Sequence, residues 1–213
     1  MVMSPGQKAI GEARFDLCGG HPALDFVNSL DNRFNDRGCI DGLQTYDDLL
    51  RFTYEARLLD LALGRQIEQS LMPSAAARAL RAGRSLREAL AAIFYSVLDE
   101  RRPPTAELET LERYLHSADR HRDLRWHTGS EHTGLAWSWR SNEGNADLPV
   151  WMVAQAAIDL LLSPELTRVR ACEAETCRWL FLDTSKNHMR RWCKMKVCGN
   201  RMKARRFHAR HSG

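Results

Sequence analysis

The spacing of apolar residues along the chain changes twice, and each change predicts a different kind of structure. Through about residue 118, and again over 147–162, apolar residues recur every three or four positions, the period of a helix that packs on one side. Between these stretches, two short tryptophan-rich segments alternate in polarity, which predicts a two-stranded hairpin. The predicted helices span 22–32, 45–63, 74–102, 105–118 and 147–162, and the predicted strands lie within 123–127 and 135–140.

Residues that start and stop helices support these boundaries. Thr45 with Asp48 three positions later is close to a capping box, and we expect Ser74 and Thr105 to cap the next two helices. Pro164 ends the last one. The pattern therefore predicts the α+β class, with a mainly helical N-terminal domain and one small hairpin over residues 1–164.

The remaining residues, 165–213, follow a different pattern. Two short strands are expected at 168–172 and 178–183, and in the second Trp179 and Phe181 lie on one face while two leucines lie on the other. A basic helix is expected from Cys198 to about Arg210. We predict that this segment forms a small C-terminal ββα-type module.

Charge divides the chain in the same place. Residues 168–213 hold 13 lysines and arginines against three acidic residues, a net charge of +10. The rest of the chain holds 18 against 24, a net charge of −6. Two regions of opposite sign indicate two tasks, and the basic one indicates a polyanionic partner.

Four cysteines in the basic segment have the spacing Cys-x4-Cys-x15-Cys-x4-Cys. Paired cysteines in a chain without a secretion signal are typical of metal ligands, and zinc prefers four thiolates in a tetrahedron. The segment has few apolar residues for a core, so its folding should depend on the metal. The predicted Zn²⁺ ligands are Cys172, Cys177, Cys193 and Cys198.

The other two cysteines, Cys18 and Cys39, are 21 residues apart, and we interpret both as ordinary thiols. The N-terminus lacks a basic start followed by an apolar run, and the most apolar stretch, 150–162, is too short to cross a bilayer. We expect a cytoplasmic protein that does not contact a membrane.

A polar stripe follows the first predicted helix. His21, Asp25, Asn28 and Asn32 are spaced by four, three and four residues, which places them on one side. Such a stripe would suit a small polar ligand, and it equally suits the solvent-facing side of an amphipathic helix. An enzyme working from His21 and Asp25 is a weaker alternative, because no further acid, base or nucleophile is identifiable and no phosphate loop, nucleophile elbow or His-Glu-x-x-His motif occurs.

The segment ACEAETCRWLFLDTSKNHMRRWCKMKVCGNRMKARRF, residues 171–207, resembles the CGNR zinc finger. The resemblance lies in both cysteine pairs, the Leu-Phe-Leu-Asp strand and the motif Cys198-Gly199-Asn200-Arg201. Upstream, GHPALDFVNSL resembles the opening of the ABATE domain, with Ser29 where the family has threonine. The resemblance implies a stress-induced transcription regulator whose N-terminal domain binds a ligand.

Together these observations predict a zinc-dependent regulator that binds duplex DNA, with a homodimer left open. An RNA-binding zinc protein is the alternative, with Trp179, Trp192 or Phe207 stacking on bases. These aromatic residues could instead pack around the zinc site, which is the role we favour for Trp179 and Phe181. On DNA, asparagine and arginine suit base edges, so we assign that role to Asn200, Arg201 and Arg205. The residues predicted to contact phosphates are Lys194, Lys196, Lys203, Arg206 and Arg210.

Overall fold

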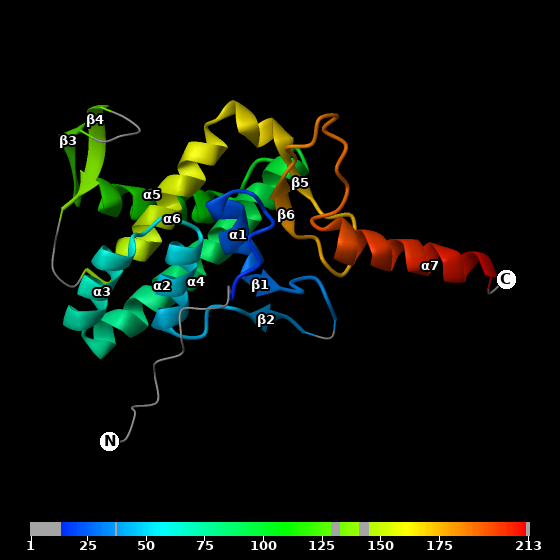
Figure 1. Cartoon of the computed structure of the whole chain (residues 1–213), viewed down its shortest axis with the longest axis horizontal. Coiled ribbons are helices and arrows are strands. Elements are labelled where there is room, and N and C mark those ends of the chain that lie inside the picture. The colour runs from blue at the N-terminus through cyan, green and yellow to red at the C-terminus, as the bar shows by residue number, and fades with distance from the viewer. Residues whose placement is uncertain (1–13, 37, 129–132, 141–144, 212–213) are drawn as a thin grey trace, which may run out of the picture.

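Helices form most of the structure between residues 22 and 161 (Figure 1). The computed structural model describes residues 14–36, 38–128, 133–140 and 145–211, apart from the side chains at 62, 206, 210 and 211. The helices are α1 (Pro22–Asn28), α2 (Tyr46–Glu55), α3 (Leu61–Ser70), α4 (Pro73–Leu98), α5 (Thr105–Asp119), α6 (Leu148–Leu161) and α7 (Asn200–His211), with a 3-10 turn η1 (Pro164–Arg168) and a π-helical turn η2 (Met195–Gly199).

The strands form three separate antiparallel pairs in the described part of the chain. They are β1 (Leu30–Asp31) with β2 (Ile40–Asp41), β3 (Arg122–Thr128) with β4 (Thr133–Trp139), and β5 (Val169–Ala171) with β6 (Leu180–Leu182). The predicted α+β class is confirmed, since a helical region with small sheets precedes a C-terminal strand pair and helix that carry four clustered cysteines.

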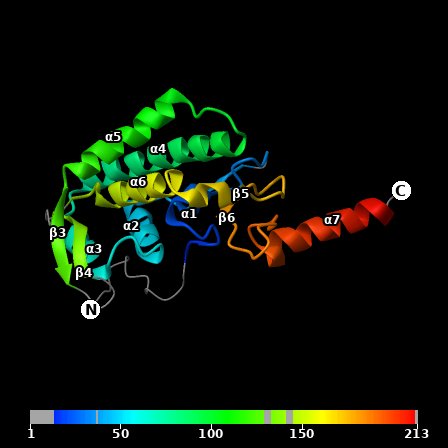
Figure 2. The ribbon, with the colours of Figure 1, turned by 90° about the horizontal axis from the view of Figure 1, so that it is seen from above.

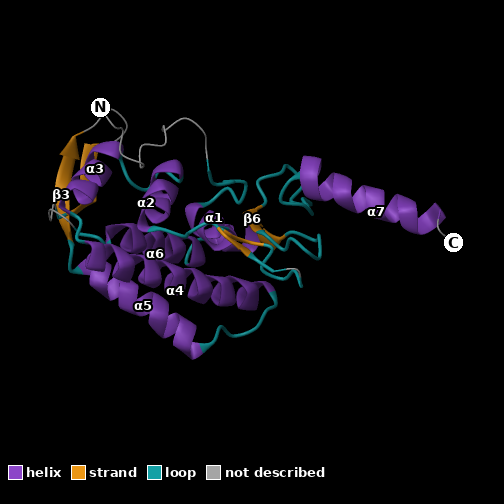
Figure 3. Ribbon diagram, turned by 90° about the horizontal axis from the view of Figure 1, so that it is seen from below, coloured by secondary structure: helices purple, strands orange, loops and turns teal. Residues whose placement is uncertain are grey.

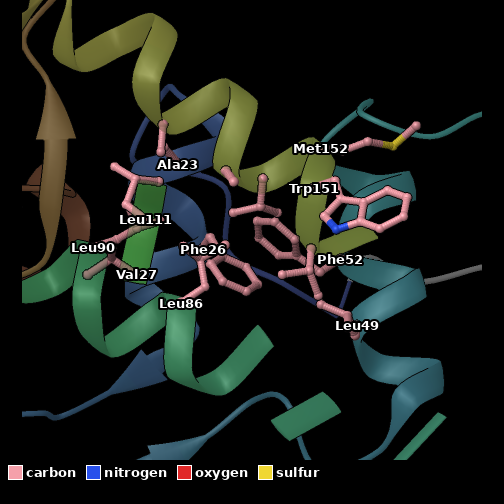
Figure 4. Packing of buried hydrophobic residues seen from close by; sticks show 14 of the residues in the cluster. Ala23, Phe26, Val27, Leu49, Phe52, Leu86, Leu90, Leu111, Trp151 and Met152 are labelled. Carbon is pink, nitrogen blue, oxygen red and sulfur yellow. The ribbon is translucent and has the colours of Figure 1, made fainter. Parts of the chain in front are cut away.

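The core lies among the helices of the N-terminal region. α4 runs beside α5 and α6, and α1 packs against both α4 and α6 (Figure 2). At the centre, the rings of Phe26 and Phe52 lie 5.1 Å apart, and Leu86, Leu90 and Trp151 close around them (Figure 4). Within the described residues, no helix is both long and apolar enough to span a bilayer.

The first helix is shorter than its pattern predicts. α1 ends at Asn28, and the next residues leave the helix to pair as β1 with β2. Asn32 then adopts a left-handed backbone with φ of 54°, which asparagine tolerates better than most residues. The predicted helix through residue 32 is wrong, because pairing with β2, about ten residues further along the chain, is a contact that helical spacing does not reveal.

The predicted helix over residues 45–63 is two helices. The capping box is confirmed, because Thr45 and Asp48 each accept a hydrogen bond from the other's backbone N–H. The chain then turns at Arg57, which has φ of 58°, and Asp60 caps α3. This turn buries Leu59. Residues 56–60 contain no proline or glycine, so tertiary packing rather than a helix-breaking residue ends α2.

Two predicted caps are also corrected. α4 begins at Pro73 and α5 at Thr105, so Ser74 and Thr105 are helical residues, and neither helix has a side-chain cap hydrogen bond. Proline at the start of α4, and Pro104 just before α5, explain both starts, because the fixed φ of proline suits the first helical turn.

The tryptophan-rich hairpin is confirmed. Strands β3 and β4 pair over seven residues each, and their base rests on α6. There the rings of Trp139 and Trp151 stack at 6.3 Å, and Arg122 donates a 2.7 Å hydrogen bond to Gln155. The hairpin lies at the opposite end of the molecule from α7 (Figure 1).

Strand β6 lies between two apolar clusters. Leu180 and Leu182 belong to the core of the helical region, whereas Phe181 belongs to a smaller cluster with the four cysteines. The predicted alternation of faces is confirmed. The C-terminal strands therefore complete the helical core on one side while they build a second cluster on the other.

The open edge of β6 is covered by a side chain and a loop. The Asn28 side-chain amide donates to the Leu180 carbonyl at 2.8 Å, and its side-chain oxygen accepts from the Leu180 N–H at 2.9 Å. Further along, the Gly19 carbonyl accepts from the Leu182 N–H at 2.7 Å. These contacts replace a third strand and satisfy buried peptide groups. A side chain at position 19 would displace its surroundings, because a Cβ there would lie 2.6 Å from the Asp25 carboxylate.

We predict that Asn28→Ala weakens the attachment of β6 to α1. The substitution leaves a buried donor and a buried acceptor of Leu180 without partners, which should lower the free energy of unfolding by about 2–4 kcal/mol. Chemical denaturation measures the change. The matched control is Asn187→Ala, at an exposed position, which should leave stability within about 0.5 kcal/mol of wild type. An equal effect of both substitutions would contradict the role of Asn28.

Candidate metal centre

The four cysteines lie on two knuckles that face each other. Cys172 follows β5, and its N–H donates to the carbonyl of Trp179 at 2.8 Å, while the N–H of Cys177 closes a turn onto Ala174. In the second knuckle the Cys198 N–H bonds to the Lys194 carbonyl at 2.9 Å within η2. Local backbone bonds thus aim each pair of sulfurs at one point.

The sulfur positions fit a tetrahedral zinc ion. All four Sγ atoms lie within 4.8 Å of one another, and Cys193 Sγ lies 3.6 Å from the sulfurs of both Cys177 and Cys198. A tetrahedron with Zn–S bonds of about 2.3 Å has sulfur–sulfur edges of about 3.8 Å. The thiols are 0% to 7% exposed, so the four-thiolate set leaves no open position for a substrate and the site is structural.

A buried carboxylate shapes the loop between the knuckles. Asp183 is fully buried at the end of β6 and accepts hydrogen bonds from the N–H and hydroxyl of Ser185 and from the N–H of Arg190. These bonds turn the chain back toward Cys193. Because the three donors satisfy the charge, this loop needs no apolar core of its own.

Cations balance the charge of the sulfurs. Four thiolates around Zn²⁺ carry about two net negative charges. Arg201 donates to Cys198 Sγ at 3.3 Å, and the start of α7 adds the positive end of its dipole. Hydrogen bonds from Cys177 and then Cys193 lower the pKa of Cys172, and hydrogen bonds with Cys172 raise the pKa of Cys177 and of Cys193.

The arrangement agrees with comparisons to known families. Residues 168–211 match the CGNR zinc finger family, and residues 20–164 match the ABATE family, described as "Putative stress-induced transcription regulator". The chain belongs to the ABATE family. No curated protein matches its sequence. In this ABATE protein the CGNR finger, residues 168–211, therefore carries the zinc centre formed by the four cysteines.

The structure places the predicted nucleic-acid residues on and before α7. Lys196, Asn200, Lys203 and Arg205 are exposed, whereas Lys194 forms a 2.6 Å ion pair with Asp16. Arg201 is exposed but also contacts the metal ligand Cys198. Arg206 and Arg210 belong to α7, and their side chains lie outside the described residues. Nucleic-acid contact by these residues stays a prediction.

The two middle residues of the predicted ligand stripe are buried, and His21 and Asn32 are half-buried. Asp25 and Asn28 are 6% and 4% exposed, with Asp25 accepting from the Gly19 N–H at 2.7 Å and Asn28 bound to β6. His21 caps α1 by accepting from the Ala23 N–H, and Asn32 lies beyond the helix. The prediction that all four residues share one side of a helix is wrong, because α1 ends at Asn28. The polar side of α1 contacts the finger through Asn28 and β6. Ligand binding at these residues stays a prediction.

Several contacts that build the centre were not indicated by the sequence. The Arg190 guanidinium lies 4.4 Å from the centroid of the Phe181 ring and donates to the carbonyl of Trp192. Trp179 donates to Asp31 of β1 at 2.8 Å, which ties the finger to a strand about 150 residues away. Cys18 is free of disulfides as predicted, but it packs against the four-cysteine cluster, and its distance along the chain from the other cysteines concealed this.

We predict one zinc ion per chain. Cys193→Ser/Cys198→Ser removes two ligands, so native mass spectrometry should show loss of the ion. α7 should lose helicity in the same variant, because Cys198 anchors its start. Cys39→Ser, at an exposed thiol, should retain the full zinc content. A metal-free wild-type protein with an intact C-terminal helix would contradict a structural zinc site.

A second prediction concerns Asp25. Burial raises its pKa to about 7, the hydrogen bond from Gly19 opposes this rise, and the charge of Asp16 adds to it. The pKa of Asp25 is higher in the folded state than in the unfolded state, so proton binding stabilises the fold. This stabilisation is fully present below about pH 4 and is lost as pH rises through 7. Asp25→Asn should thus be more stable than wild type at pH 8, by up to about 4 kcal/mol.

The pH series supplies its own control. The gain in unfolding free energy of Asp25→Asn should shrink between pH 8 and pH 5, because both proteins carry the same zinc site and differ only in one titrating group. Thermal and chemical unfolding at matched pH values measures the difference. A constant difference across this range would show that Asp25 is ionised in the folded protein throughout.

Proposed function

We propose that this transcription-regulator family member binds duplex DNA through its CGNR finger, with α7 as the element that enters the major groove. The proposal is supported by the placement of α7, which leaves the body of the protein and projects away from it in every view (Figure 1, Figure 2, Figure 3). Beyond Met202, which packs on the cysteine cluster, its described side chains are exposed.

The dimensions of α7 suit this role. Its 12 residues give a length of about 18 Å, and the major groove, about 12 Å wide, admits one helix. The helix begins two residues after Cys198, so the zinc centre fixes its direction. A helix of this length with so little packing is marginal alone, and contact with a polyanion would stabilise it.

The basic side chains of α7 suit contacts with both phosphates and base edges. The helix carries five arginines and lysines and no acidic residue. We assign Lys196 and Lys203, with Arg206 and Arg210, to phosphates, and Lys194 joins them when it exchanges Asp16 for a phosphate. Asn200 and Arg205 are assigned to base edges. Arg201 is assigned to base edges as well, through the N–H groups that do not donate to Cys198.

The RNA alternative is weakened by the use of its aromatic residues. Trp179 packs against the cysteine cluster and bonds to Asp31, and Trp192 packs against the same cluster, so two of the three proposed stacking residues serve the finger itself. Phe207 is 59% exposed on α7. DNA binding accounts for the projecting basic helix without requiring these rings.

A response to a small polar molecule stays a prediction for the ABATE region. His21, Asp25 and Asn28 already hold backbone groups, which disfavours both a ligand and catalysis there. A hollow of about 380 Å³ lies elsewhere, between the β3–β4 hairpin and α6. It is lined by Arg122, Trp137, Ser138, Trp139, Gln155 and Asp159.

Salt dependence tests the proposed DNA contact. If about six cations of the finger engage phosphates, the logarithm of the binding constant should fall with the logarithm of salt at a slope of roughly −5. Lys203→Ala should weaken binding to all sequences alike and flatten the slope by about one, whereas Arg205→Ala should also relax discrimination at one base pair by about 1–3 kcal/mol. Fluorescence anisotropy with the full chain measures both.

Arg113→Ala is the matched control, because this exposed cation lies on α5 in the ABATE region. It should leave affinity and slope unchanged. Binding that is insensitive to salt, or equal for all variants, would overturn the proposal. A strong preference for single-stranded RNA over duplex DNA would select the alternative.

A further inference from the structure

A fifth thiol lies against the zinc centre. Cys18, on the segment before α1, packs against the cluster of the four ligand cysteines and contacts the thiol of Cys193. Its neighbour Gly19 is the residue whose carbonyl accepts a hydrogen bond from β6. A residue 154 positions from the first zinc ligand is therefore part of the same cluster.

Contacts on both sides hold Cys18 opposite Cys193. The guanidinium of Arg190 donates to the backbone carbonyls of both residues, at 3.4 Å for Cys18. Asp16, two residues before Cys18, pairs with Lys194, one residue after Cys193. One arginine and one ion pair thus fix the register of the two segments.

The two sulfurs differ in access. Cys193 is 3% exposed, as expected for a ligand inside a closed zinc site, whereas Cys18 is partly exposed. With zinc bound, Cys193 is a thiolate, the nucleophilic form of cysteine. A small oxidant from solvent meets Cys18 first, and the sulfur behind it is a metal-bound nucleophile.

We propose that Cys18 and Cys193 form an oxidation-sensitive pair that opens the zinc centre when a peroxide reaches it. The sulfur of Cys18 attacks the peroxide, the O–O bond breaks, and Cys18 becomes a sulfenic acid as hydroxide leaves. The sulfur of Cys193 leaves zinc and attacks the sulfenic sulfur, which breaks its S–O bond. The thiol proton of Cys18 converts the first hydroxide to water, and the hydroxide that leaves the sulfenic acid takes a proton from solvent. One thiol, one thiolate, one hydrogen peroxide and one proton thus give one disulfide and two waters.

The step removes one ligand from the metal. Three thiolates remain, zinc is released more readily, and the start of α7 loses its anchor because Cys198 belongs to the same knuckle as Cys193. A dithiol reductant reverses the disulfide. The oxidation itself does not depend on the proposed DNA binding, which would only be one of its readouts.

Zinc release from the full-length zinc-loaded protein tests the pair. Hydrogen peroxide is added in the presence of a zinc-chelating dye, with wild type, Cys18→Ser and Cys39→Ser compared. Wild type and Cys39→Ser should release zinc at the same rate, since Cys39 is exposed but is not in the cysteine cluster. Cys18→Ser should release it several-fold more slowly. Equal rates for wild type and Cys18→Ser would overturn the proposal.

Disulfide mapping of oxidised wild type decides the matter even if Cys18→Ser binds zinc poorly. Trypsin separates Cys18, Cys193 and Cys198 into the peptides 15–33, 192–194 and 197–201, while the first two ligands stay together in 171–178. A cross-link between 15–33 and 192–194 that forms as zinc is lost, and disappears on reduction, is the expected result. Cross-links confined to the four ligand cysteines would refute the assignment to Cys18.

Discussion

The pairing of the Asn28 side chain with the Leu180 peptide is the contact on which the arrangement of the two regions depends. Leu180 lies between two apolar clusters, so its N–H and C=O are out of reach of water and need partners. One amide supplies both an acceptor and a donor, at 2.9 and 2.8 Å. Because Asn28 is the last residue of α1, the position of the helix sets the position of β6, and β6 in turn sets the first zinc knuckle.

Zinc stabilises the folded finger, whereas apolar burial stabilises the helical region. The finger has few side chains to bury. Among the described residues, its cluster has Ala174, Phe181 and the four cysteines as buried members. Four metal–sulfur bonds join two knuckles that hydrogen bonds alone would hold weakly. Asp183 and Arg190 then use charge and hydrogen bonds to shape the intervening loop, which lets a strongly basic segment fold without a large core.

This division of labour explains the shape of the molecule. The side of the finger that faces α1 is apolar and shared with the core, so the finger is attached firmly. The side that carries α7 needs little packing, because the zinc centre anchors the helix at its first turn. Positive charge is thereby displayed away from the acidic region, which would repel a polyanion if the helix lay against it (Figure 1). The contact between Gly19 and β6 also brings the neighbouring Cys18 against the metal ligands.

Local signals were sufficient for much of this. Cysteine spacing predicted the four ligands, the alternation around Phe181 predicted the two faces of β6, and Thr45 with Asp48 predicted a helix start, because each depends on neighbours within a few residues. The end of α1, the turn at Arg57, and the roles of Asn28, Arg190 and Cys18 required the tertiary structure. Each of these is decided by a partner about 10 to more than 150 residues away or by what a turn allows the chain to bury. A polar stripe at helical spacing looks the same in sequence whether it faces water, a ligand or the backbone of a distant strand, and here the strand β6 occupies it.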